Sequence, residues 1–508
     1  MINDCSERLH TDEPAGLRLI GALRDYILHV MAARGTPGLN IALAHRGTLI
    51  WEAGFGLADV AAGTLMTPDT TYRSGSLGKT YTATAIMILV DLGTISLDDP
   101  INRHLPFKVS NPLGRREVTV RDLMVHKSGL GLDAALPAWA PARSLAATLE
   151  AEFAKDVSPI MRGTEPRWRS EVGTSWCYSN LGAATLGLIV ETANPEKLSF
   201  SEFVQRHVMD PLGMTHSQYP TAQHPDFARP ELLESISTGY ARMGVADIPT
   251  IPLYFDEYPA GGVIARPADH IRLLLAMMNK GDLDGYRLLA PETVEQMLSP
   301  ATDLGGVVLG LDDVAQGLIW RLSNHGKPIA SFFHAGGHMF GWRTQGRAWP
   351  HFKTAVMVAS NQWSLPDDIH DVEQIANFVG EWLPFETRVD IAEGGTVSEA
   401  AVSYVRGALL AAGYCAFCGV EGAPPKDAIE HLIANTRCIP GIRNDWDADA
   451  FRRGFEAIFR TDGTVAGVRR FWSSSDCEVD SATVRRAYRS LGGRIPGAMS
   501  NLLPDEPS

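Results

Sequence analysis

Ser74-Gly75-Ser76-Leu77-Gly78-Lys79 places Ser76 and Lys79 three residues apart, where a loop becomes a predicted helix. One helical turn separates the two side chains, so we expect the Lys79 amine beside the Ser76 hydroxyl, at the positive end of the helix dipole. A neutral lysine there can accept the serine proton, and backbone N–H groups of the turn can hold an oxyanion. The stretch therefore predicts a serine nucleophile, although S-x-x-K also occurs by chance in a chain of this length.

A second polar element lies downstream in Tyr178-Ser179-Asn180, directly before an apolar predicted helix. Alternate residues of an extended segment point the same way, so the Tyr178 phenol and the Asn180 amide are expected to face one cleft. For this pair alone, a tyrosine that merely caps a helix start is the more common interpretation. Tyr178 and Asn180 indicate a catalytic site only in combination with Ser76 and Lys79.

The third element is Phe332-Phe333-His334-Ala335-Gly336-Gly337-His338-Met339-Phe340-Gly341, at the end of a predicted strand. Paired glycines within a strand let another backbone or a ligand approach closely. A strand edge beside a bound acyl group can contribute an N–H to an oxyanion hole. A tight turn around a core histidine explains the same residues by themselves, so this element also depends on the other two.

Composition excludes several classes of partner. The 508 residues carry a formal net charge of −14 with no dense run of Lys and Arg, which disfavours nucleic acid and anionic membrane surfaces. No uninterrupted apolar run reaches the roughly 18 residues of a membrane span. The acidic residues 1–16 contain no apolar run, so we expect no secretory signal and a cytoplasmic address. The expected partner is a small molecule or short peptide, and self-association into a homo-oligomer is left open.

The cysteines favour reduced thiols over a metal site. Six cysteines are few for this length, and Cys5 and Cys177 stand apart from the rest. The late group, Cys415, Cys418, Cys438 and Cys477, contains one C-x-x-C pair, but its other two members are far apart. We therefore expect reduced thiols and no bound metal or cofactor. A structural zinc ion held by the late cysteines is the alternative.

Hydrophobic periodicity predicts an α+β chain, in which an antiparallel sheet flanked by helices is interrupted by a helical block. We expect a catalytic domain over residues 1–385, with its sheet part at about 15–75 and 250–385 and its helical part at about 76–249, and a small α+β accessory domain over 386–508. Predicted helices cover 17–33, 80–92, 120–126, 144–155, 181–192, 200–209, 268–279, 291–298 and 372–382, and predicted strands 39–44, 49–53, 261–265, 317–322, 329–334 and 354–360. The accessory domain is expected to contain helices over 397–412, 425–435 and 482–491 and a hairpin over 457–472.

In this order, the three elements resemble the serine β-lactamase and penicillin-recognising family, especially its class C β-lactamase-like, DD-peptidase and family VIII esterase branches. The matching pieces are Ser76-Leu77-Gly78-Lys79 for S-x-x-K, Tyr178-Ser179-Asn180 for Y-x-N, and His334-Ala335-Gly336 where the family has K-T-G or H-x-G. Connecting stretches at 126–130, 210–215 and 259–262 also look like the family's. The resemblance covers about residues 15–385 and implies nothing for the last part of the chain.

The resemblance implies a role for each matching residue. Ser76 would be the acylated nucleophile, and Lys79 and Tyr178 would share the work of the base. Asn180 would orient the acyl side of the substrate, while the N–H groups of Ser76 and Gly337 would form the oxyanion hole. His334 and Gly336 occupy the K-T-G position, and a histidine there weakens the positive charge that faces a substrate carboxylate. Trp139, Trp168 and Trp176 either wall an acyl pocket or pack in the core.

We therefore expect a serine hydrolase that cleaves an ester or amide bond of a small intracellular substrate through a Ser76 acyl-enzyme. A biosynthetic transacylase is an alternative, because an alcohol or amine can resolve the same intermediate. β-Lactamase or DD-peptidase activity is another. An inactive binding protein on this scaffold would be expected to lack Ser76, Lys79 or Tyr178. The chain has no G-x-S-x-G of an α/β-hydrolase and no H-x-H or H-E-x-x-H of a metal hydrolase.

Overall fold

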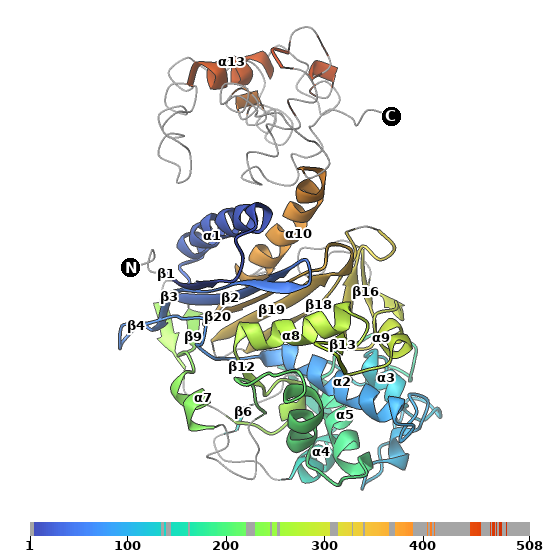
Figure 1. The fold of residues 1–508 in the computed structure, drawn as a ribbon. Helices are drawn as coiled ribbons and strands as arrows, with labels where there is room; N and C mark the ends of the chain where they lie inside the picture. Colours follow the sequence, from blue (N-terminus) through green and yellow to red (C-terminus); the bar gives the residue numbers. More distant parts are fainter. Residues whose placement is uncertain are drawn as a thin grey trace. The chain divides into compact units, whose positions relative to one another are not determined.

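The computed structural model describes the chain in two compact units, Met1–Gly16 with Ile27–Asn377 and Leu17–Tyr26 with Phe378–Ser508. The described residues are 5–133, 137–138, 144–160, 163–219, 229–243, 246–250, 254–304, 313–327, 329–338, 341–364, 371–389 and 448–458, with scattered positions between 404 and 484. Figure 1 labels the helices and strands. The assignment of residues 1–385 and 386–508 to two domains stays a prediction.

The central sheet of the first unit is antiparallel and follows the order β1-β3-β2-β20-β19-β18-β17-β16-β15, with β4 paired to β3. Because β2 pairs with β20, strands from the start of the chain join strands from beyond residue 310. This confirms the predicted antiparallel sheet. Its strands are β1 (Cys5–Leu9), β2 (Gly38–His45), β3 (Thr48–Asp59), β4 (Thr64–Leu65), β15 (Thr302–Asp303), β16 (Val314–Gln316), β17 (Arg321–Ser323), β18 (Ser331–His338), β19 (Trp342–Trp349) and β20 (Thr354–Ser360).

Helices pack on the sheet and on one another in the inserted block. Helix α8 packs on β2, β19 and β20, while α2 packs on α5 and α6, and their buried side chains belong to one hydrophobic cluster (Figure 1). The helices are α1 (Pro14–Arg34), α2 (Lys79–Asp91), α3 (Val120–Met124), α4 (Leu145–Phe153), α5 (Asn180–Ala193), α6 (Phe200–Val204), α7 (Pro230–Glu234), α8 (Pro267–Met278), α9 (Pro291–Met297) and α10 (Asp371–Val389). They confirm the predicted helices of this region to within a few residues, except at α10.

Short elements complete the first unit. Single helical turns are η1 (Gly75–Gly78), η2 (Ile101–Arg103), η3 (Gln205–Met209), η4 (Tyr258–Ala260) and η5 (Pro350–Phe352). Small paired strands are β5 (Tyr72–Arg73) with β12 (Ile264–Ala265), β6 (Pro137–Ala138) with β11 (Tyr254–Phe255), β7 (Val157–Ile160) with β8 (Gly163–Pro166), β13 (Asp282–Leu283) with β14 (Tyr286–Arg287), and β9 (Tyr240–Met243) with both β10 (Ala246–Pro249) and β21 (Gln362–Ser364).

The β2–β3 hairpin contains the two strands that the sequence predicted over 39–44 and 49–53. Its loop is Arg46-Gly47, and both residues have positive φ, 52° and 86°. A two-residue hairpin turn of this kind needs positive φ at both positions and matches the right-handed twist of the strands.

Three predictions about secondary structure need correction. The strand predicted over 317–322 is two strands, β16 and β17, because the Gly317 N–H donates to the Trp320 carbonyl and Ile319 has a φ of 65°, which makes a turn. Strand β19 was not predicted at all, nor was β1. Helix α10 continues to Val389, past Leu383-Pro384-Phe385, where the sequence suggested a boundary.

The described part of the second unit comprises Leu17–Tyr26 of α1, the end of α10 from Phe378 to Val389, α13 (Ala448–Ile458) and scattered positions. Phe451, Phe455 and Ile458 lie at helical spacing and are buried, as is Tyr404. The hairpin predicted over 457–472 is wrong where the structure describes it, because residues 457–458 belong to α13 and residues 468, 470 and 471 are also helical. The helices predicted over 425–435 and 482–491 lie almost entirely outside the described residues.

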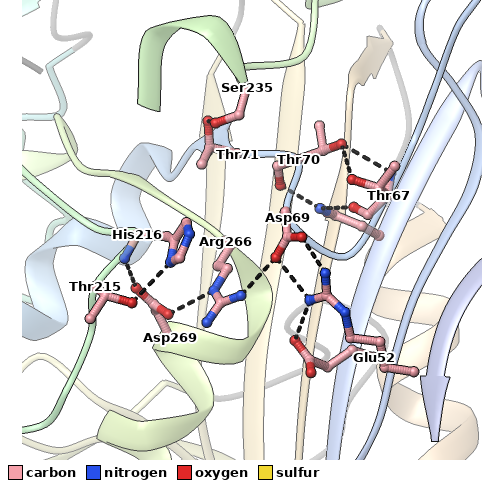
Figure 2. A network of polar contacts seen from close by, with 12 residues as sticks. Glu52, Thr67, Asp69, Thr70, Thr71, Thr215, His216, Ser235, Arg266 and Asp269 are labelled. Carbon is pink, nitrogen blue, oxygen red and sulfur yellow. Dashed lines mark hydrogen bonds and ion pairs between the residues drawn. The ribbon is translucent and has the colours of Figure 1, made fainter. Parts of the chain in front are cut away.

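A network of polar contacts joins β1, the loop before β5 and the start of α8 (Figure 2). The Asp69 carboxylate accepts hydrogen bonds of 2.8 Å from both Arg8 and Arg266. Arg266 also donates to Asp269, 2.9 Å, and Asp269 accepts from the backbone N–H of His216. Two guanidinium groups thus surround one carboxylate, and the bond from Arg8 is the largest cause that lowers the pKa of Asp69 to about 2.

This network predicts a pH-dependent contribution to stability from Asp69. Because its pKa is lower in the folded than in the unfolded chain, where it is about 3.9, the stabilisation is present above pH 4 and disappears as the pH falls towards 2. Asp69 is half exposed, so we expect Asp69→Asn to cost only about 1 kcal/mol near neutral pH. Urea unfolding from pH 7 to pH 3 should show this difference shrinking with falling pH. If the difference in free energy of unfolding between Asp69→Asn and wild type did not change with pH, the assignment of the effect to this network would be contradicted. An equal difference for Asp156→Asn, at an exposed position, would contradict it as well.

Candidate active site

Ser76 lies in η1, the turn that leads directly into α2. Two long-range hydrogen bonds hold this turn, since the Ser74 N–H donates to the Val263 carbonyl, 2.8 Å, and the Thr344 hydroxyl donates to the Ser74 carbonyl, 2.7 Å. Ser76 therefore stands at the N-terminal end of α2, where the helix dipole favours negative charge. Sequence and structure agree on this position.

Strand β18 lies directly against the nucleophile turn at its glycine pair. A side chain at Gly336 would collide with the Ser74 carbonyl oxygen and would lie 3.0 Å from the Leu77 nitrogen. A Cβ on Gly75, which has a φ of 54°, would lie 2.8 Å from the Gly337 nitrogen. Only glycine permits this approach, and it brings the backbone of Gly337 beside the turn that carries Ser76, as the predicted oxyanion hole requires.

The close approach at Gly336 predicts a large local effect of one methyl group. Gly336→Ala should lower the free energy of unfolding by about 1–3 kcal/mol, because the new Cβ overlaps backbone atoms that cannot move independently. Gly337→Ala is the matched control, since its Cβ would meet mainly the far end of the flexible Arg343 side chain. Chemical denaturation of both variants measures the difference. Equal losses would mean that the contact between β18 and the turn is looser than described.

Lys79 is fully buried and points back at Ser76. Its Nζ lies 3.2 Å from Ser76 Oγ, 2.7 Å from Asn180 Oδ1 and 2.6 Å from the carbonyl oxygen of Ala260. These acceptors match the three N–H groups of an ammonium. The structure thus brings together Ser76, Lys79 and Asn180, which the sequence placed in one site.

Tyr178 joins the site through its ring. Lys79 Nζ lies 4.8 Å from the ring centroid, and the His126 ring packs on the tyrosine at 4.7 Å. The phenol oxygen is buried and makes no hydrogen bond to Ser76 or Lys79. His126 is itself neutral, because burial and then the charge of Lys79 lower its pKa to about 3. Whether Tyr178 takes part in proton transfer stays a prediction.

Asp133, which no sequence motif marks, fixes the start of α5. Its carboxylate accepts hydrogen bonds from the Ser179 hydroxyl, 2.8 Å, and from the backbone N–H groups of Asn180 and Leu181, 3.0 Å each. The Asp133 carbonyl accepts from Asn180 Nδ2, 2.8 Å, so both ends of the Asn180 amide are engaged. No local pattern marks Asp133 as part of the site, because all its partners lie more than forty residues away.

Acidic groups surround the Lys79 ammonium at a distance. Burial raises the pKa of Asp133, opposed by its hydrogen bonds and by Lys79. Burial, followed by the Asp133 charge, raises the pKa of Glu257 to about 8. Glu257 lies just before η4, whose Ala260 carbonyl binds Lys79. The site therefore combines the buried Lys79 with two carboxyl groups of raised pKa, a pattern typical of functional sites.

His334 is buried, and its Nδ1 lies 2.7 Å from the Ala335 carbonyl, to which Nδ1–H donates. Burial, followed by the charges of Arg321 and Lys79, holds the pKa of His334 well below its ordinary value. The imidazole is therefore neutral at pH 7 and provides no fixed positive charge where the family's K-T-G has a lysine.

The remaining candidates contribute packing or lie outside the description. Trp168 stacks on Phe153 against the core, and Trp176 meets His126 edge-on, while Trp139 lies outside the described residues, as do Cys415, Cys418 and Cys438. Within the described ranges, no group of three or more His, Cys, Asp or Glu could hold a metal ion. None of the described helices is long and apolar enough to cross a membrane.

An antiparallel sheet with an inserted helical block, and a serine and lysine at a helix start between them, together define the serine acyl-transfer class of the penicillin-recognising proteins. Comparison with known proteins agrees. The sequence model of the beta-lactamase family matches residues 23–379, so the chain belongs to this family.

Two curated relatives match part of the chain. Protein flp of Staphylococcus aureus (strain MW2) is 28% identical over 194 residues, which is 38% of this chain and 37% of that protein. An uncharacterized protein of Mycobacterium tuberculosis (strain CDC 1551 / Oshkosh) is 28% identical over 273 residues, 49% of this chain and 66% of that protein. The match thus spans little more than a third of the length of flp.

Two solved structures share the fold. The octameric penicillin-binding protein homologue from Pyrococcus abyssi has a TM-score of 0.55 at 24% identity, with 73% of this chain and 81% of that chain covered. A class C β-lactamase has a TM-score of 0.57 at 18% identity, with 76% and 100% covered. These likenesses agree with the predicted β-lactamase/transpeptidase-like fold.

Proposed function

We propose that this chain is a serine hydrolase that cleaves an ester or amide bond, including that of a short peptide, through an acyl-enzyme on Ser76. The observation that carries the proposal is the 3.2 Å contact between Lys79 Nζ and Ser76 Oγ at the N-terminal end of α2. A buried lysine directed at a helix-terminal serine suits an activated nucleophile, because the dipole and the amine both favour the attacking alkoxide.

In this proposal, Ser76 Oγ attacks the substrate carbonyl and its proton passes to Lys79 in its neutral amine form, with Tyr178 as the second candidate base. The carbonyl oxygen takes up negative charge and is held by the N–H groups of Ser76 and Gly337. Collapse expels the alcohol or amine, which receives the proton, and leaves the acyl group on Ser76. Water then attacks the ester carbonyl, and its proton returns through the same base to Ser76 Oγ.

Asn180 and His334 complete the proposed substrate site. Asn180 would orient the acyl side of the substrate; its Oδ1 accepts from Lys79, and its Nδ2 donates to the Asp133 carbonyl. His334 and Gly336 belong to the strand that would run beside the bound acyl group. The neutral His334 favours esters and amides over ligands that need a lysine at this position, which makes β-lactamase and DD-peptidase activity the less favoured alternatives.

We place the substrate inside the cell, since six cysteines in 508 residues suit a reducing compartment. Transfer of the acyl group to an amine or alcohol instead of water remains the alternative outcome of the same intermediate. Self-association is a further part of the proposal, suggested by the octameric neighbour from Pyrococcus abyssi. Light scattering on the purified protein measures it directly.

Intact-mass spectrometry tests the proposed chemistry. The protein is mixed rapidly with a p-nitrophenyl ester, a chromogenic cephalosporin or a D-amino acid amide, and the mass added to the chain is measured. An adduct equal to the acyl part, located on the peptide that contains Ser76, supports the proposal. Turnover without any adduct on that peptide, even at short times and low pH, contradicts it.

A further inference from the structure

His126 holds the chain on both sides of Tyr178. Its carbonyl oxygen accepts a hydrogen bond from the Cys177 N–H, 2.8 Å, and its ring Nδ1 accepts a longer one from the Ser179 N–H, 3.4 Å. In an extended segment the N–H groups of residues two apart point to the same side, so one histidine can receive both. Tyr178 lies between these two residues, and the centroid of its ring is 4.7 Å from that of the imidazole.

The backbone of His126 has an unusual conformation. Its φ is 55°, in the left-handed region that residues other than glycine seldom adopt, and its N–H donates to the Leu123 carbonyl, 3.2 Å. Glycine would make the same turn without this cost. The histidine side chain is only 2% exposed, so it is retained in a strained and buried position, a combination that is found at functional sites.

The imidazole of His126 is neutral and carries its proton on Nε2. Burial, followed by the charges of Lys79 and Arg321, lowers its pKa to about 3. Because Nδ1 accepts the hydrogen bond from Ser179, the single proton of the neutral ring is on Nε2. This Nε2–H is buried and has no hydrogen-bond partner among the described residues. A buried donor without a partner is unfavourable, so it calls for one.

Two more buried polar atoms beside the same imidazole have no partner within the described ranges. They are the phenol oxygen of Tyr178 and Nε1 of Trp176, whose ring meets the imidazole edge-on at 6.2 Å. A buried water typically makes about three hydrogen bonds to such groups. One water molecule that accepts from the two N–H groups and donates to the phenol oxygen satisfies all three atoms.

We propose that His126 is a positioning residue for Tyr178, which it holds by the backbone on either side and by a bound water molecule shared with Trp176 and the phenol oxygen. A hydrogen bond donated to the phenol oxygen stabilises the phenolate, the form in which Tyr178 would take the Ser76 proton. This inference rests on the proposed function, in which Tyr178 is the second candidate base, and deepens it.

A double-mutant cycle of His126→Asn and Tyr178→Phe tests the inference on the full chain. Asparagine tolerates positive φ, and its amide oxygen can still accept from Ser179, but it has no donor at the place of Nε2. With p-nitrophenyl butyrate we expect His126→Asn to lower kcat by about 10- to 100-fold and to change KM by less than about 3-fold. In the Tyr178→Phe background the same substitution should change kcat by less than about 3-fold, because the group that His126 positions is gone.

Two further variants check the water and the control. Trp176→Phe keeps an aromatic ring but removes the second N–H donor, so kcat should fall by about 3- to 10-fold, and this loss should also disappear in the Tyr178→Phe background. His270→Asn is the matched control, since His270 is fully buried, has a pKa that burial lowers to about 3, and contacts Tyr81 instead, 2.9 Å. Its effect on kcat should be the same in both backgrounds. Urea unfolding measures the stability of every variant, and Trp176→Phe carries the test if His126→Asn does not fold.

Four results overturn the inference. They are an unchanged kcat in His126→Asn, an unchanged kcat in Trp176→Phe, an equal loss for His126→Asn with and without the phenol, and a Tyr178→Phe variant with the kcat of wild type. The parent proposal fails separately, because it is contradicted when Ser76→Ala hydrolyses the ester as fast as wild type, whatever the cycle gives.

Discussion

Ser76→Ala is expected to lower kcat for ester hydrolysis by at least about 10⁴-fold, because the covalent step has no other nucleophile. Folding should be unaffected, since the hydroxyl contributes only the 3.2 Å contact with Lys79. Steady-state kinetics with a p-nitrophenyl ester measure the loss, and intact mass should show that no acyl-enzyme accumulates. The residual rate reports what the oxyanion site and binding achieve without the serine.

Ser74→Ala is the matched control for this variant. Ser74 lies two residues away, and its hydroxyl donates to the carbonyls of Gly75 and Gly261 instead of facing Lys79. We expect Ser74→Ala to lose little stability and to keep a kcat for ester hydrolysis close to that of wild type. A Ser76→Ala variant that is as active as Ser74→Ala would rule out the acyl-enzyme mechanism.

Lys79→Met is expected to lower kcat/KM by about 10²- to 10⁴-fold through loss of the base. Acylation should slow by the same factor, measured by intact mass at short reaction times. Stability should change little, because removing a buried ammonium removes its desolvation cost but leaves Asn180 Oδ1 and the Ala260 carbonyl without their donor.

Lys155→Met, at an exposed lysine paired with Glu152, controls for loss of a charge. The rate expected for Lys79→Met also separates the two candidate bases. If the variant retains nearly full activity at high pH, where a phenol can ionise, Tyr178 carries the proton transfer and Lys79 only orients the serine.

Most strands of the sheet could be predicted, because runs of apolar and β-branched residues are typical of buried strands. Strand β19 could not be predicted in this way. Its sequence includes Arg343, Thr344, Gln345 and Arg347, which resembles a surface loop, yet the strand lies between β18 and β20. Arg343 and Arg347 are accommodated because α10 supplies Glu373 and Asn377 as partners. A short stretch of sequence does not show partners that lie on another element. Prediction from local sequence therefore misses central strands that contain polar residues.

The residues of the candidate site also fall into two groups, those that local sequence predicts and those that it does not. Ser76, Lys79 and Asn180 lie in short motifs whose spacing sets their geometry, and the structure brings them within hydrogen-bond distance. Asp133 has no such spacing, because it holds the start of α5 from more than forty residues away. Its proximity to the site depends on tertiary structure alone.

The hydrogen bond from Thr344 to the Ser74 carbonyl links positions 270 residues apart. Contacts of such separation form late in folding, because the chain between them must first be ordered. A growing chain on the ribosome would therefore contain Ser76 and Lys79 long before β18 and β19 exist, and it would not yet have the wall of the site that Gly336 and Gly337 provide. The site around Ser76 would therefore stay incomplete until the ribosome has passed Trp349, which lies well before the end of the 508-residue chain.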